Sequence, residues 1–159
     1  MLGTHFLLNL VTTKQAAAAA QQLMGNPKNY SAALLRTVLF SPERIQVRSE
    51  GTLVFPWEAK RGSQNGIKSV HGGALSSLAD AFTKIHAQAY LPQACVESVS
   101  FEISFLSAVF EDKKCNCMTR LVRLEDTIVF TDFLFEGEGS DEVYARGTHV
   151  LTANPRIGN

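Results

Sequence analysis

Apolar residues recur every three or four positions after residue 73, and this spacing predicts one long helix. Its apolar positions are Leu75, Leu78, Ala79, Phe82, Ile85 and Ala89. Most of its remaining positions are small or uncharged, which is typical of a helix enclosed by other structure. Only Asp80 and Lys84 carry a formal charge between Ala74 and Gln88. Because a buried charge is costly without a partner, Asp80 is a candidate functional residue.

Alternating apolar and polar residues on both sides of this helix predict β-strands. Before the helix, residues 44–48 and 52–55 form a hairpin around a turn at 49–51. Four strand-like segments separated by short polar turns follow the helix, at residues 96–109, 115–124, 127–136 and 143–152. Two strands, one helix and four more strands predict an α+β fold, with an antiparallel sheet packed on one central helix.

The first strand after the helix shows a clear alternation. Val99, Phe101, Ile103 and Phe105 share one face, and Ser98, Ser100, Glu102 and Ser104 share the other. One face is therefore expected to pack on the helix, and the other to meet water, a ligand or a second subunit.

The N-terminal part of the chain has a different composition. Five consecutive alanines between Lys14 and Gln21 predict a helix over residues 10–24, and Gly25-Asn26-Pro27 provides a stop. A low-complexity linker is the alternative interpretation. Ser31 is expected to cap a short second helix that runs through Leu35, and a strand that begins within residues 36–40 is the alternative.

Composition excludes several classes of function. The 159 residues carry a formal net charge of zero, so no basic surface indicates nucleic acid. The three cysteines do not form a disulfide framework or a zinc motif, and we expect no metal and no cofactor. No apolar run is long enough to span a membrane. A cytoplasmic location is expected, and the absence of acidic residues before Glu43 leaves a mitochondrial one open.

The entrance to the long helix is the second candidate for chemistry. Gly72 and Gly73 expose backbone N–H groups at the positive end of the helix dipole, which suits an anion or a developing oxyanion. Asp80 lies eight residues further, about 12 Å along the axis. One carbonyl cannot reach both groups in the same chain, so their cooperation requires a second chain with its helix antiparallel alongside. His71 is expected to fix the loop or to bind substrate, whereas His86 and His149 have no evident partner and are interpreted as structural.

The sequence contains no G-x-S-x-G nucleophile elbow, no dinucleotide-binding glycine motif, no P-loop and no H-E-x-x-H. The remaining candidates are a carboxylate and backbone N–H donors.

The spacing of the candidate residues resembles that of a known family. Asn65 lies six residues before the histidine of His71-Gly72-Gly73, Asp80 lies nine residues after it, and Ser98 follows eighteen residues later. This pattern resembles the hotdog-fold acyl-CoA thioesterases of the PaaI-like group, which includes thioesterase superfamily member 2. The segment from Ala145 to His149 is also similar to the last strand of that family. The resemblance covers residues 40–154 and leaves the alanine-rich segment without a role.

The resemblance implies a hotdog fold, in which a sheet wraps a long helix and dimers form by edge-to-edge pairing, often assembling into tetramers. We expect a helical extension at 1–40 from its composition, a hotdog thioesterase domain at 41–154 from the resemblance, and a tail at 155–159. The implied reaction is hydrolysis of acyl-CoA in lipid metabolism. A non-catalytic acyl-CoA-binding module and an enoyl-CoA hydratase or dehydratase are the alternatives.

Roles for individual residues follow from the same resemblance. The Gly72 N–H would polarise the thioester carbonyl, and Asn65 would position substrate or water while His71 holds the loop. Asp80 of the partner subunit would act as general base or nucleophile, with Ser98 orienting the water. Basic side chains are expected near the phosphates of CoA. The candidate substrate-binding residues are Gly73, Lys68, Arg61 and Arg146, with Lys60, Arg120 and Arg123 as further basic candidates.

Overall fold

The computed structural model describes residues 11–48 and 51–156. The expectations for residues 1–10, for the hairpin turn at 49–50 and for the tail at 157–159 fall outside these ranges. The helices are α1 Thr13–Met24, α2 Tyr30–Thr37 and α3 Gly72–Tyr90, with short 3-10 turns at Pro42–Arg44 and Arg61–Ser63. The strands are β1 Gln46–Val47, β2 Thr52–Glu58, β3 Ala94–Phe105, β4 Lys114–Glu125, β5 Ile128–Gly137 and β6 Val143–Pro155.

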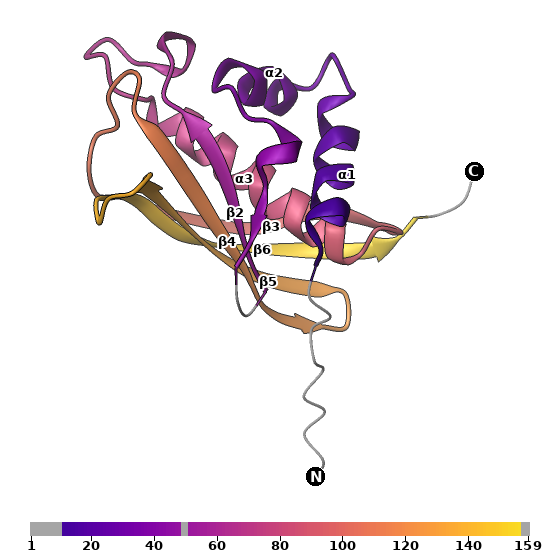
Figure 1. The fold of residues 1–159 in the computed structure, drawn as a ribbon. Helices are drawn as coiled ribbons and strands as arrows, with labels where there is room; N and C mark the ends of the chain where they lie inside the picture. Colours follow the sequence, from indigo (N-terminus) through magenta and orange to yellow (C-terminus); the bar gives the residue numbers. More distant parts are fainter. Residues whose placement is uncertain (1–10, 49–50, 157–159) are drawn as a thin grey trace.

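All six strands form one antiparallel sheet in the order β1-β2-β4-β5-β6-β3. Strand β3 forms one edge of this sheet, because α3 carries the chain from β2 across to β6 (Figure 1). The sheet packs on one side of α3, and α1 and α2 contact α3 from outside the sheet. This arrangement is the α+β fold that the sequence pattern predicts and the hotdog fold that the family resemblance implies.

The core is centred on α3, as its small and apolar composition indicates. Eleven of its nineteen residues are buried. Phe82 stacks on Phe55 of β2 with ring centroids 4.6 Å apart, and Phe40 packs against both rings. Aromatic rings in this arrangement stabilise a core beyond the area that they bury. The position of α3, and hence of any side chain on it, is therefore fixed by packing.

The two N-terminal helices share this core. The buried alanines of α1, Ala16, Ala19 and Ala20, belong to the same hydrophobic cluster as α3. A Thr12–Gln15 capping box begins α1. Asn29, and not Ser31, caps α2, because its Oδ1 accepts a hydrogen bond from the Ser31 N–H at 2.8 Å. The domain limits at residues 40 and 154 stay a prediction.

Candidate active site

The N-terminus of α3 presents one unoccupied backbone donor. His71 is the N-cap, and its Nδ1 accepts a hydrogen bond from the Gly73 N–H at 2.9 Å. The Gly73 N–H is thus already used within the loop. Among the described residues we find no acceptor for the Gly72 N–H. Because this group lies at the positive end of the helix dipole, it can bind a partial negative charge.

Asn65 holds the loop that leads into this helix. Its Oδ1 accepts from the Ile67 N–H at 3.0 Å and from the Ser69 N–H at 3.2 Å, and its Nδ2 donates to Ser69 Oγ at 3.0 Å. Lys68, at φ 63°, completes the tight turn. Asn65 therefore fixes the loop as His71 does, and one hydrogen of its amide nitrogen is left to reach a ligand.

A cavity of about 340 Å³ opens beside Gly72. Its lining includes the apolar side chains of Phe105, Leu106 and Val109. A Cβ at position 72 would lie 3.2 Å from the Phe105 ring, so the glycine leaves room between the helix end and this ring. The Gly72 N–H consequently borders a space that a substrate can enter.

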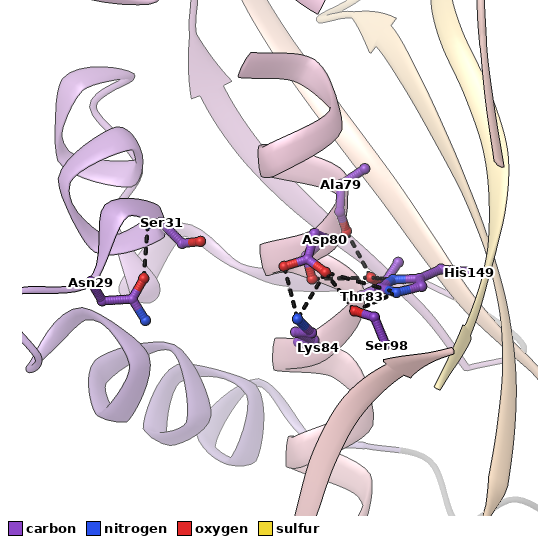
Figure 2. Close-up of polar contacts among 8 residues, drawn as sticks. All are labelled: Asn29, Ser31, Ala79, Asp80, Thr83, Lys84, Ser98 and His149. Atoms are coloured by element: carbon purple, nitrogen blue, oxygen red, sulfur yellow. Dashed lines mark hydrogen bonds and ion pairs between the residues drawn. The ribbon is translucent and has the colours of Figure 1, made fainter. Parts of the chain in front are cut away.

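Asp80 lies two turns further along α3 and is held by two side chains (Figure 2). Ser98 Oγ on β3 donates to Asp80 Oδ1 at 2.9 Å. Lys84 Nζ lies 2.9 Å from Oδ1 and 3.0 Å from Oδ2 of the same carboxylate. The Asp80 and Lys84 side chains are 32% and 30% exposed, so both can still meet a ligand.

His149 on β6 lies next to Ser98 (Figure 2). Its Nε2 is 3.0 Å from Ser98 Oγ, and its Nδ1 is 2.7 Å from the hydroxyl of buried Thr83. Burial lowers the pKa of His149 to about 4, against the opposing effect of Asp80. Ser98 donates its one hydrogen to Asp80, and Thr83 donates its one hydrogen to the Ala79 carbonyl at 2.7 Å. Neutral His149 has a single N–H, so it donates to only one of these two hydroxyls.

A β-bulge explains how Ser98 reaches Asp80. Simple alternation places Ser98 on the face opposite to Phe101, and this prediction is wrong. The pairing of β3 with β6 shifts between Ser98, opposite Leu151, and Ser100, opposite Val150, which leaves Val99 as the extra residue. A bulge re-aims the side chains on one side of it. Ser98 therefore faces α3, as Phe101 does.

Among the basic residues expected near CoA, Arg120 and Arg146 line one cavity, and the others lie apart from it. Arg61 and Lys68 lie in exposed segments that precede α3. Arg146 lines a cavity of about 610 Å³ together with Glu102 and Ser104, which belong to the sheet face turned away from α3. The other candidates are engaged in ion pairs, Lys60 with Glu58 and Asp112, Arg120 with Asp132, and Arg123 with Glu125.

Gly72 and Asp80 lie on the same helix, about 12 Å apart along its axis. One protomer therefore brings Asp80, Ser98, His149, Thr83 and Lys84 together, and keeps Gly72 and Asn65 in a separate group.

The histidines show what sequence reasoning could not find. His86 is buried against Thr119, at 2.7 Å, and burial lowers its pKa to about 3, which agrees with a structural role. The sequence around His149 does not distinguish it from His86, but the His149 ring contacts Ser98. Its distance of fifty-one residues from Ser98 left no local signal. Lys84, four residues after Asp80, could have been found from helical spacing.

Comparisons with known proteins agree with this geometry. The family model described as the thioesterase superfamily matches residues 68–144, the segment that contains Gly72, Asp80 and Ser98. No curated protein matches the chain in sequence. In the part of the chain that the structure describes, no helix is long and apolar enough to cross a membrane.

Solved structures show the same fold at low identity. The E. coli PaaI protein from the phenylacetic acid degradation operon has a TM-score of 0.71 and 18% identity, over 92% of this chain and 96% of its own. Zebrafish thioesterase superfamily member 2 has a TM-score of 0.74 and 15% identity, over 89% and 97%. A hypothetical thioesterase from Streptococcus pneumoniae with coenzyme A has a TM-score of 0.64 and 16% identity, over 72% and 90%. Residues 68–144 are thus similar to the thioesterase superfamily, and the chain has the hotdog fold of these solved structures.

Proposed function

We propose that this protein is a homodimeric thioesterase that hydrolyses acyl-CoA to a free acid and CoA. The observation that carries the proposal is the group around Asp80, in which Ser98 and Lys84 orient a carboxylate on an otherwise buried helix. Such a carboxylate can act on water without a metal or a nucleophilic serine. The solved pneumococcal structure contains coenzyme A, which supports a CoA thioester as substrate class.

The reaction needs two chains. The thioester carbonyl oxygen accepts a hydrogen bond from the Gly72 N–H of one protomer, and Asp80 of its partner removes a proton from water. The water oxygen bonds to the carbonyl carbon, and the resulting oxyanion is stabilised by the Gly72 N–H and the helix dipole. The carbon–sulfur bond then breaks, and the thiolate of CoA takes the proton that Asp80 holds.

The edge strand supports the dimer. Strand β3 pairs only with β6 among the described strands, so its other edge is open. Val99 and Phe105 on β3 are 59% and 53% exposed, and Leu106 just beyond it is equally exposed. An open edge with exposed apolar side chains is suited to pairing with a second copy about a two-fold axis. The pairing of dimers into a tetramer, the contacts of Arg61, Lys68, Gly73 and Arg146 with CoA, and the cellular location stay predictions.

Free-thiol release from a panel of acyl-CoAs tests the reaction. We expect Asp80→Asn to lower kcat by about 10²- to 10⁴-fold, because it removes the base. We expect Gly72→Pro to lower kcat by about 10²-fold, because it removes the backbone N–H. Proline suits the first helical residue, and His71, at φ −63° and ψ 136°, already has the conformation required before proline.

Gly72→Ala is the matched control, because it adds the same Cβ beside Phe105 and keeps the N–H. Wild-type turnover by Asp80→Asn, or equal losses in Gly72→Pro and Gly72→Ala, would contradict the mechanism. CoA binding without turnover by the wild type would favour a binding module, and hydration of an enoyl-CoA in place of thiol release would favour a hydratase.

A further inference from the structure

A second cavity adjoins the Asp80 group. It has a volume of about 270 Å³ and lies between α1, the start of α2, α3 and β3. Lys84, which pairs with Asp80, forms part of its wall. Five of its nine lining residues have polar side chains, namely Gln22, Asn26, Asn29, Lys84 and Gln88. A cavity with such a lining is unsuited to a plain alkyl chain, since the polar groups would lose water without gaining partners.

Helix geometry makes this cavity the continuation of the proposed active site. Asp80, Lys84 and Gln88 are four residues apart and follow one side of α3, with steps of about 6 Å. In the proposed antiparallel dimer, the partner helix begins level with Asp80. From Asp80 toward Gln88, the partner helix does not cover α3. The cavity beside this part of α3 is bounded by the chain's own α1 and α2. An acyl group attached at Asp80 can therefore extend past Lys84 toward Gln88.

Existing hydrogen bonds show which donors and acceptors remain for a ligand. Gln88 Nε2 lies 3.1 Å from each of the carbonyl oxygens of Leu91, Pro92 and Ala94, which share its two hydrogens, and Oε1 remains as an acceptor. Asn29 uses its Oδ1 on the Ser31 N–H at 2.8 Å, which leaves its amide N–H groups as donors. Figure 2 shows Asn29 on the side of the N-terminal helices and Lys84 on α3, and both line the cavity.

We propose that this cavity binds the distal end of the acyl group and selects acyl chains that carry a hydroxyl group there. A hydroxyl can accept a hydrogen bond from Lys84 or Asn29 and donate one to Gln88 Oε1. A methyl end satisfies none of these groups, and a site built to bond a hydroxyl discriminates strongly against the analogue that lacks it. This inference rests on the proposed thioesterase function and names its substrate class.

The charge of the cavity favours a neutral hydroxyl over a carboxylate. The ammonium of Lys84 already lies 2.9 Å from Asp80, so the charge of this carboxylate balances that of Lys84. A carboxylate at the acyl end would add a second negative charge close to Asp80, and like charges at short range repel. The hydroxyl adds hydrogen bonds without adding charge.

Calorimetric binding of thioether analogues tests the proposal without requiring turnover. The probes are S-hexyl-CoA, S-(6-hydroxyhexyl)-CoA and S-(5-carboxypentyl)-CoA, which are matched in length. We expect the hydroxyl analogue to bind wild type at least about tenfold more tightly than the alkyl analogue, the gain of one or two net hydrogen bonds. The carboxylate analogue is expected to bind no more tightly than the alkyl one.

Lys84→Met and Gln88→Met should each reduce this preference to about twofold or less. The Gln88 substitution also removes the contacts of this side chain with three carbonyls, so a further variant is needed. Asn29→Ser shortens a side chain in the cavity wall and keeps a capping side chain for α2. Lys114→Met, which removes an exposed lysine that does not line this cavity, should keep the wild-type preference.

Equal binding of the hydroxyl and alkyl analogues by wild type would overturn the proposal. Tightest binding of the carboxylate would overturn the choice of a hydroxyl. If Lys84→Met weakened all three probes equally, Lys84 would act on the shared CoA portion and not on the acyl end. A wild type that binds the hydroxyl analogue preferentially but releases no thiol from any acyl-CoA would refute the thioesterase proposal alone.

Discussion

Both oxygens of the Asp80 carboxylate are hydrogen-bonded within its own protomer. Ser98 reaches Oδ1 from β3, and Lys84 reaches Oδ2 from one turn further along α3. A half-exposed pair at this spacing contributes only about 0.3–0.5 kcal/mol to stability. Its larger effect is on geometry, because a carboxylate oriented before substrate arrives does not have to be ordered during the reaction.

The two buried histidines predict how stability depends on pH. Burial lowers the pKa of His86 to about 3 and that of His149 to about 4, whereas an unfolded histidine titrates near pH 6.5. Between about pH 6.5 and pH 4 the unfolded chain binds more protons than the folded chain, so stability falls as pH is lowered. We expect each histidine to contribute at most about 1.4 kcal/mol per pH unit, measured by urea unfolding.

His86→Gln separates this effect from the titration of carboxylates. The glutamine amide keeps a hydrogen bond to Thr119 and does not titrate, so the pH slope of the variant should be shallower than that of the wild type. Identical slopes in the two proteins would show that His86 does not contribute.

At the scale of elements, periodicity predicted most of the fold. The helix at Gly72–Tyr90 follows from apolar spacing, and its burial follows from its lack of charge. The four later strands follow from alternation between polar turns, although β3 ends at Phe105 and not at residue 109. These features depend on neighbouring residues in the chain, which a single sequence displays.

The parts of the site that could not be predicted depend on pairing between distant segments. The bulge at Val99 arises from the register of β3 against β6, and it alone turns Ser98 toward Asp80. The contact of His149 with Ser98 arises from the same pairing. Ser98 itself was identified by the family resemblance, which carries information about register that alternation lacks.

The pairing of β3 with β6 also makes a testable demand on Gly147. A Cβ at this position would overlap the Glu102 carbonyl oxygen and lie 2.6 Å from the Phe133 ring. Because backbone cannot move aside without breaking the pairing, Gly147→Ala should cost about 3 kcal/mol or more of unfolding free energy. Thr148→Ala, at the exposed neighbouring position, should change it by less than about 0.5 kcal/mol. Similar losses in both variants, measured by urea unfolding, would contradict the close approach.

At the scale of the whole molecule, the separation of Gly72 from Asp80 requires the site to be shared between protomers. Homodimers of Asp80→Asn and of Gly72→Pro should both be inactive, since every site lacks one of the two groups. A hybrid dimer has one site with both defects and one with neither. Co-refolding equal amounts of the two variants should therefore restore activity, to about a quarter of the wild-type value if the chains mix at random.

Differently tagged chains allow the hybrid to be purified, and its activity should then be about half that of the wild-type dimer. Tandem purification of an Asp80→Asn chain with a differently tagged Asp80→Asn chain is the matched control and should give no activity. If the purified hybrid were as inactive as its parents, each site would have to lie within one protomer. The geometry of α3 excludes a site within one protomer, because one carbonyl cannot contact an N–H and a carboxylate that lie about 12 Å apart. The inactivity of one parent would then come from damage to the fold and not from the loss of a reacting group.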